Sequence, residues 1–177
     1  GEEFLIPGIC EHIEKTQVHA GDSISVYPSV SVSDGIKDKV VEYTARLVHE
    51  LGIRGLLNIQ FVVYDNELYV RSASVVATRN IPFMTKASAL PIVEFATRLM
   101  LGESLRDIGI GTGLYREPSK YFVRVPVFSF AQLEGADVRL GSEMKSTGEV
   151  MGVADTFAEA LLKGFIASGM RIKRTGG

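Results

Sequence analysis

Apolar residues recur at helical spacing in the first third of the chain and predict an amphipathic helix from Ser33 to about Leu51. The apolar stripe consists of Ile36, Val40, Tyr43, Leu47 and Leu51. Ser33 suits the N-cap position, because its side chain can accept a hydrogen bond from a free amide of the first turn. Gly52 suits the C-terminal stop, because glycine adopts the left-handed backbone that ends many helices.

A β-hairpin is predicted to follow this helix, because the residues from Leu56 to Tyr64 have the composition of a strand. Asp65-Asn66 suits a two-residue turn, after which Glu67 to about Val76 returns. One face of the first strand carries Leu57, Ile59, Phe61 and Val63. Asn58 and Gln60 point to the other face, where two readings are open: a ligand site or the solvated face of a half-exposed sheet.

Shorter segments complete the predicted elements. Extended segments are expected at Leu5–Glu14, Ile24–Tyr27, Tyr121–Phe130 and Glu149–Val153. A helix is expected at Ile92–Leu101, opened by Pro91 and closed by Gly102. Another is expected at Phe157–Ala167, with a Thr156/Glu159 capping box and a stop at Gly169. Pro126 predicts an edge strand, because proline cannot donate a hydrogen bond to a neighbouring strand. The mixed order of elements favours an α+β fold over a doubly wound parallel sheet.

Composition narrows the classes of function. The chain has 177 residues and a formal net charge of -2, which argues against a nucleic-acid-binding surface, since such a surface needs a basic excess. The single cysteine, Cys10, cannot form an internal disulfide and fits a reducing cytoplasm. No apolar run reaches about 18 residues, so no membrane span is expected, and the acidic N-terminus shows no signal peptide.

Few residues indicate chemistry on their own. His19 lies beside the Gly21-Asp22-Ser23 turn, where it either contacts the polar edge of a ligand or caps the turn. The glycine-rich stretch from Gly109 to Gly113 does not open an obvious helix, so a phosphate loop is only weakly indicated. No Ser-His-Asp or Cys-His arrangement can be read from the spacing, and no catalytic residue is assigned.

Several segments resemble the large subunit of carbamoyl phosphate synthetase along nearly the whole chain. The matching stretches are Glu11-His12-Ile13-Glu14, Val18-His19-Ala20-Gly21-Asp22-Ser23, Arg54-Gly55-Leu56-Leu57-Asn58-Ile59-Gln60-Phe61, Ile81-Pro82-Phe83 and, most specific, Met144-Lys145-Ser146-Thr147-Gly148-Glu149-Val150-Met151-Gly152-Val153. Ser146-Thr147-Gly148 and Val18-His19 are similar to the second, carbamate-phosphorylating half of that subunit. The resemblance implies the C-terminal lobe of an ATP-grasp fold at residues 1–118, with a mixed or antiparallel sheet and packed helices, followed by the C-terminal segment of the synthetase unit at 119–177.

The resemblance also implies a function for the intact parent enzyme. That enzyme is an ATP-dependent, cytoplasmic ligase of arginine and pyrimidine biosynthesis. It makes carbamoyl phosphate from bicarbonate, glutamine-derived ammonia and two ATP, with Mg²⁺ or Mn²⁺ as cofactor. Its implied partners are the rest of the large subunit and the glutamine amidotransferase small subunit, and a homo-oligomer is also expected. The alternative is a non-catalytic scaffold or assembly module that retains the fold.

Binding residues follow from the resemblance position by position. The segment that lines the adenosine part of ATP corresponds to Gln17, Val18, His19 and Ala20. Gln60 matches a ligand of both metal and nucleotide. Ser72 occupies a further metal- and nucleotide-binding position, and Ser74 a further metal-binding position.

The returning strand of the hairpin departs from the family. The family carries Glu-Val-Asn-Pro-Arg where this chain has Ser72-Ala73-Ser74-Val75-Val76. Two neutral hydroxyls cannot replace a carboxylate as ligands of Mg²⁺, so metal binding is expected to be weakened or lost. A degenerate natural copy, an engineered change and a sequence error are three open explanations. The family's N-terminal lobe, its lid and its allosteric domain are also expected to be absent, and the isolated chain is expected to be inactive.

Overall fold

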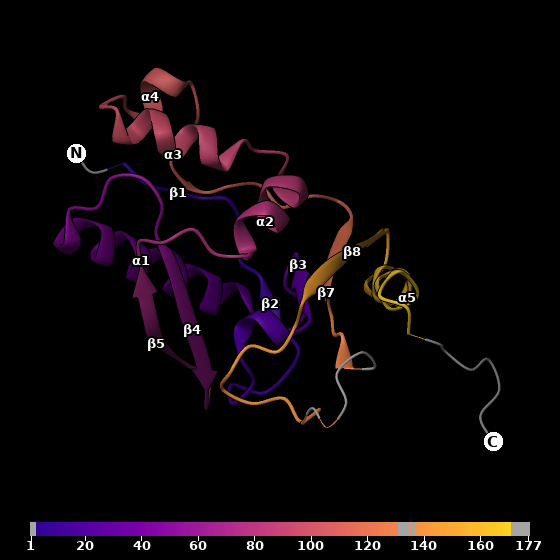
Figure 1. Ribbon diagram of the computed structural model, residues 1–177. Helices are drawn as coiled ribbons and strands as arrows, with labels where there is room; N and C mark the ends of the chain where they lie inside the picture. The colour runs from indigo at the N-terminus through magenta and orange to yellow at the C-terminus, as the bar shows by residue number, and fades with distance from the viewer. Residues whose placement is uncertain (1–2, 131–134, 136, 171–177) are drawn as a thin grey trace. The chain divides into compact units, whose positions relative to one another are not determined.

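The computed structural model describes residues 3–130, 135 and 137–170. The chain forms two compact units, each built from two stretches of sequence (Figure 1). Unit 1 combines Gly1–Ile9 with Ser31–Glu117, and unit 2 combines Cys10–Val30 with Pro118–Gly177.

The long helix of unit 1 forms where the sequence predicts it. Helix α1 spans Asp34–Leu51, and the Ser33 hydroxyl accepts a hydrogen bond from the Ile36 amide at 3.4 Å. Gly52 follows in the left-handed region with φ 56°. Both capping predictions are therefore confirmed.

A two-stranded hairpin packs against this helix (Figure 1). Strand β4 spans Asn58–Tyr64 and strand β5 spans Glu67–Ser74. The two turn residues, Asp65 and Asn66, both have positive φ, 50° and 59°, as the tight hairpin turn that matches strand twist requires. The small core beneath the hairpin consists of Ile36, Val40 and Leu68, with Ile9, Val32, Tyr43 and Phe61 packed around it.

Three short helices and a strand pair complete unit 1. They are α2 (Asn80–Ser88), α3 (Ile92–Met100), α4 (Leu105–Ile108) and the parallel pair of β1 (Leu5–Ile6) with β6 (Gly113–Leu114). Helix α3 follows the prediction and ends one residue earlier, whereas α2 and α4 were not predicted. Gly109 terminates α4 with φ 81°, so the start of the glycine-rich stretch ends a helix.

The described residues of unit 2 form a four-stranded antiparallel sheet with an α-helix packed on it. The strand order is β2-β3-β7-β8, formed by Glu11–His12, Ser25–Tyr27, Tyr121–Val127 and Gly148–Ala154. Helix α5 (Phe157–Ala167) covers one face and begins at Thr156, whose hydroxyl accepts from the Glu159 amide at 3.3 Å. The core between sheet and helix consists of Val26, Val123, Val125, Ala154 and Ala160.

Helix α5 lies unusually close to strand β8. A Cβ atom added to Gly152 would lie 1.9 Å from the Ala160 carbonyl oxygen and 2.6 Å from the Gly164 nitrogen. Because both neighbours are backbone atoms, no side-chain rotation could relieve the clash. Gly152 therefore sets how deeply the helix sits on the sheet.

The prediction that Pro126 marks an edge strand is wrong. Strand β7 is an inner strand, flanked by β3 and β8. On β7, strand β3 pairs with Phe122–Arg124 and has ended before it would reach Pro126, which lies opposite Glu149 of β8. At Pro126, β7 has no strand partner on its β3 side, so the missing N–H of proline costs the sheet no hydrogen bond on that side.

Within the described ranges, no helix is both long enough and apolar enough to cross a membrane.

Candidate functional site

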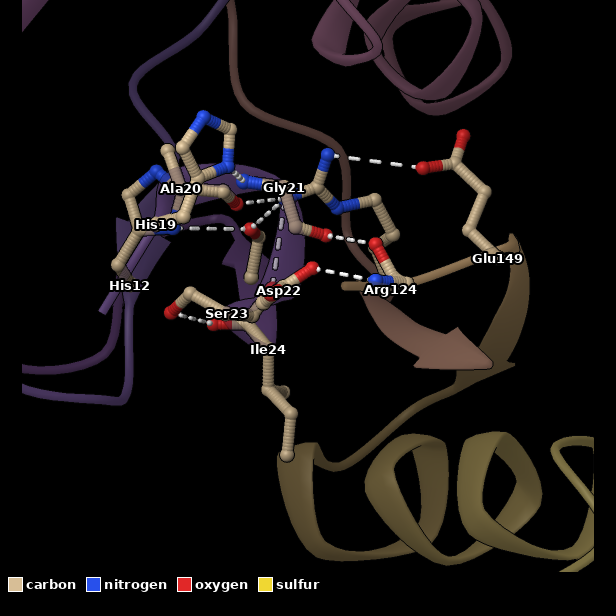
Figure 2. Close-up of polar contacts among 11 residues, drawn as sticks. His12, His19, Ala20, Gly21, Asp22, Ser23, Ile24, Arg124 and Glu149 are labelled. Atoms are coloured by element: carbon tan, nitrogen blue, oxygen red, sulfur yellow. Dashed lines mark hydrogen bonds and ion pairs between the residues drawn. The ribbon is translucent and has the colours of Figure 1, made fainter. Parts of the chain in front are cut away.

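One face of the unit 2 sheet carries a row of polar side chains, one from each strand (Figure 2). His12 pairs with Ser25, and Ser25 pairs with Arg124, so the three side chains share a face. His12 Nδ1 lies 3.2 Å from Ser25 Oγ, and Arg124 Nη1 lies 3.6 Å from Glu149 Oε2 on β8. The opposite face carries the apolar core under α5.

Arg124 links this row to the turn that contains His19. Its side chain is 3% exposed. One guanidinium nitrogen, Nη2, lies 2.8 Å from the Ala20 carbonyl and 2.9 Å from Ser25 Oγ, and donates to both. A buried guanidinium requires such acceptors and an ion partner, because an uncompensated buried charge is strongly destabilising. The backbone at Ala20 is thereby fixed to strand β7.

The His19 side chain caps the short 3₁₀ turn Ala20–Asp22. Its Nδ1 accepts a hydrogen bond from the Gly21 amide at 3.0 Å. In a neutral imidazole one nitrogen accepts and the other carries the proton, so this contact leaves Nε2 as a donor. In Figure 2 the far edge of the ring points away from Asp22 and Arg124. The capping reading of His19 is thus confirmed, and it is compatible with a ligand contact through Nε2.

Asp22 ends this turn, and its carboxylate is fully buried, with 0% of the residue's surface exposed. Its two oxygens accept from the backbone amides of Lys145, at 2.7 Å, and Ser146, at 2.8 Å. Burial alone would raise the pKa of Asp22, but hydrogen bonds from Ser146 and Lys145 and the nearby His19 together hold the pKa below its usual value. The carboxylate is therefore charged at neutral pH.

The second candidate group lies on the hairpin of unit 1. Gln60 pairs directly with Ser72, and Asn58 pairs with Ser74. The strand register shifts by one residue between Gln60 and Phe61, which leaves Arg71 as an extra residue on β5. This shift turns both serines to the face of the two amides, whereas Phe61 and Leu68 face α1.

The donor set on this face does not fit Mg²⁺ or Mn²⁺. Its four side chains are two amides and two hydroxyls, and all are neutral. Hard divalent cations need oxygen ligands that include carboxylate charge. Over the described part of the chain, no three His, Cys, Asp or Glu side chains gather into a group that could hold a metal ion.

The site residues predicted from sequence divide between the two units. The residues Gln17, Val18, His19 and Ala20 lie in unit 2, and Gln60, Ser72 and Ser74 lie in unit 1. Within each unit the structure brings the members together, on one turn and on one hairpin face. Sequence reasoning missed Asp22 and Arg124 as part of this framework. A charged residue inside the apolar stretch Tyr121–Val127 was the available signal for Arg124, because arginine is almost never buried without a partner.

Solved structures with the same architecture define the class of fold. The biotin carboxylase domain of a single-chain bacterial carboxylase aligns with a TM-score of 0.54 at 18% identity, covering 59% of this chain and 25% of that one. A single-chain, multi-domain long-chain acyl-CoA carboxylase aligns with a TM-score of 0.64 at 16% identity, covering 81% of this chain and 18% of that one. At these identities the likeness shows the fold alone, which is the α+β lobe of an ATP-grasp protein.

The family follows from sequence. Residues 7–108, more than half of the chain, match the family described as "Carbamoyl-phosphate synthase L chain, ATP binding domain", and the chain belongs to this family. The carbamoyl phosphate synthase large chain of Clostridium botulinum (strain Kyoto / Type A2) is 52% identical over all 177 residues. That of Clostridium perfringens (strain 13 / Type A) is 50% identical over 170 residues, or 96% of this chain. The chain spans 17% and 16% of the lengths of these relatives. The resemblance read from the sequence motifs is confirmed.

Proposed function

We propose that this chain is the ATP-binding lobe of the carbamate-phosphorylating half of a carbamoyl phosphate synthase large chain, with residues 1–118 as the lobe and 119–177 as the segment that follows. The observation that carries the proposal is the family match together with the turn at His19, which is fixed on several sides by unit 2. Residues Gln17, Val18, His19 and Ala20 would line the adenosine part of ATP. Because Nδ1 accepts from the Gly21 amide, the His19 ring offers Nε2–H to an acceptor on the nucleotide.

By the resemblance, Gln60, Ser72 and Ser74 on the hairpin of unit 1 occupy metal- and nucleotide-binding positions of the parent enzyme. Metal ions bound there in the parent enzyme neutralise the charge of the phosphoryl group in transfer. Gln60, Ser72 and Ser74 supply no negative charge, so we expect nucleotide binding without productive phosphoryl transfer. The chain would bind nucleotide through its adenosine end, and no step of the reaction is assigned to its residues.

The test is a calorimetric titration of the 177-residue chain with ATP, with and without Mg²⁺, beside an assay for carbamoyl phosphate. We expect saturable ATP binding with little dependence on Mg²⁺, and no carbamoyl phosphate. Turnover by this chain would overturn the inactive reading. No binding at millimolar ATP would refute the nucleotide site and favour the second candidate, a scaffold module, which the neutral hairpin face supports.

A single substitution tests the metal part of the proposal. Ser72→Glu places a carboxylate opposite Gln60 and is expected to create Mn²⁺ binding that broadens the NMR signals of Asn58 and Gln60. Ala73→Glu is the matched control, because it changes the charge by the same amount on the opposite face of the strand, where Ala73 pairs with Ile59. Equal broadening in both variants would show that charge alone, without the polar face, recruits the ion.

Activity, cytoplasmic location and partners belong to the same proposal for the longer protein. There, Ser72→Glu, Ser74→Asn and Val76→Arg together are expected to restore carbamate phosphorylation. The remaining large chain and the glutamine amidotransferase subunit would be its partners. Continued inactivity of the triple variant would place the loss elsewhere in the chain.

A further inference from the structure

A second segment of unit 2, residues 141–146, lies against the His19 turn. The His19 amide donates to the Gly141 carbonyl at 2.7 Å. At the far end of the turn, Asp22 accepts from the amides of Lys145 and Ser146. Ser146 Oγ also donates to the Gly21 carbonyl at 3.2 Å. The turn is therefore bound to this segment at both of its ends and in the middle.

The packing on the turn is equally close. A Cβ atom added to Gly21 would lie 2.7 Å from the sulfur of Met144 and 3.1 Å from His19 Nδ1. The Met144 side chain and the His19 ring thus occupy the same side of the turn. Glycine is the residue that fits there, because any side chain would press on the nitrogen that caps the turn.

We propose that Asp22 and residues 141–146 form a clamp that positions His19 and keeps its ring in the Nε2–H tautomer for the nucleotide. The inference rests on the proposed function, which places the adenosine beside residues 17–20. Asp22 is a positioning residue, since it acts through the turn. The clamp gives a role to Met144-Lys145-Ser146, the start of the most specific family motif, that requires no contact with the ligand.

The chemistry of Asp22 explains why a carboxylate is needed. Hydrogen bonds from backbone amides to an ionised carboxylate are stronger than those between neutral groups. An asparagine has one acceptor oxygen and one NH₂ group. In Asp22→Asn, the NH₂ group would face the N–H of either Lys145 or Ser146, so one bond of the pair becomes a contact between two donors.

The test uses NMR on the intact 177-residue chain without nucleotide. At pH 8 the ¹⁵N shifts of the wild-type His19 ring are expected to show the Nε2–H tautomer alone. In Asp22→Asn we expect mixed tautomers and at least about tenfold faster amide exchange at His19, Lys145 and Ser146. Faster exchange at Lys145 and Ser146 with an unchanged His19 tautomer and amide would overturn the clamp.

Glu14→Gln is the matched control. Glu14 accepts from the Ser23 hydroxyl and from the Ile24 amide, just beyond the turn, and no bond joins it to residues 141–146. We expect His19 to be unchanged in this variant. If Asp22→Asn unfolds unit 2, Ser146→Ala removes the side-chain bonds of Ser146 to Gly21 and Asp22 and keeps the backbone donors. A smaller change of the same kind at His19 would support the clamp. An unchanged His19 in this variant would refute it.

An ATP titration completes the test and separates the two proposals. In Asp22→Asn the Kd for ATP is expected to rise about tenfold, and in Glu14→Gln to stay as in the wild type. A wild-type chain that binds no ATP refutes the proposed function, whereas the tautomer and exchange data decide the clamp without nucleotide. Equal Kd values for wild type and Asp22→Asn, with His19 released in the variant, would overturn the role of the clamp in binding.

Discussion

The close packing of α5 on β8 predicts a large cost for a single methyl group. In Gly152→Ala the new Cβ would lie 1.9 Å from the Ala160 carbonyl oxygen, whereas ordinary contacts begin at 3.4 Å. The difference of 1.5 Å must come from backbone movement, because the clashing atoms belong to the helix itself. Lifting α5 would loosen the core that contains Val125 and Ala160. We expect a loss of about 3 kcal/mol in the free energy of unfolding, at the upper end of the range for overpacked cores.

Gly148→Ala is the control for this prediction. It lies on the same strand, and its Cβ would meet Val127 at an ordinary 3.8 Å. This variant is expected to be neutral or stabilised by about 0.5 kcal/mol, because alanine loses less backbone entropy than glycine. Urea unfolding followed by circular dichroism, with amide exchange in β8 and α5, measures both. A Gly152→Ala chain within about 0.5 kcal/mol of the wild type would refute the reasoning, since it would mean that α5 can shift without loss.

Three further predictions concern other parts of the chain. Burial raises the pKa of Cys10 from 9.0 to about 12, against the opposing charge of Arg124; the native thiol should therefore react with a disulfide reagent at pH 8 at least about tenfold more slowly than in urea, and equal rates would contradict this. Because the folded pKa of Asp22 lies below its ordinary 3.8, its contribution to stability is present above pH 3.8 and is lost as the pH falls through the lower, folded pKa. In urea unfolding from pH 7 to 3, the free energy of unfolding should therefore fall less steeply on acidification in Asp22→Asn than in the wild type. Equal slopes would contradict this prediction. Ala89 ends α2 with φ 57°, so Ala89→Gly should raise the thermal midpoint by relieving about 1 kcal/mol of strain, while Ala87→Gly, within the helix, should lower it.

Local signals explain which elements could be predicted from the sequence. The stripe of α1 with its Ser33 cap, and the Asp65-Asn66 turn, each depend on neighbours within a few residues. Helix α2 has no such signal: no side chain caps it at Arg79, and Pro82 lies in its first turn. A proline is tolerated there because the first amides of a helix have no partner within it.

Pairing between residues far apart in the sequence explains which features the pattern of apolar and polar residues could not predict. Strict alternation would place Ser72 and Ser74 on the face of Leu68, and only the extra residue Arg71 moves them to the face of Gln60. The candidate residues on the turn were likewise found through resemblance, whereas the partners of Asp22 lie more than 120 residues away. Sequence patterns report local geometry, and these contacts depend on how distant segments meet.

The path of the chain through unit 2 has a consequence for its biosynthesis. Strand β3 ends at Tyr27 and its partner β7 begins at Tyr121, so the sheet cannot close until the intervening stretch has been made. At about 5–20 residues per second, a ribosome needs roughly 5–20 seconds for that stretch. During this interval the nascent β3 exposes an unpaired edge, and we expect this strand to be a binding site for chaperones on translating ribosomes.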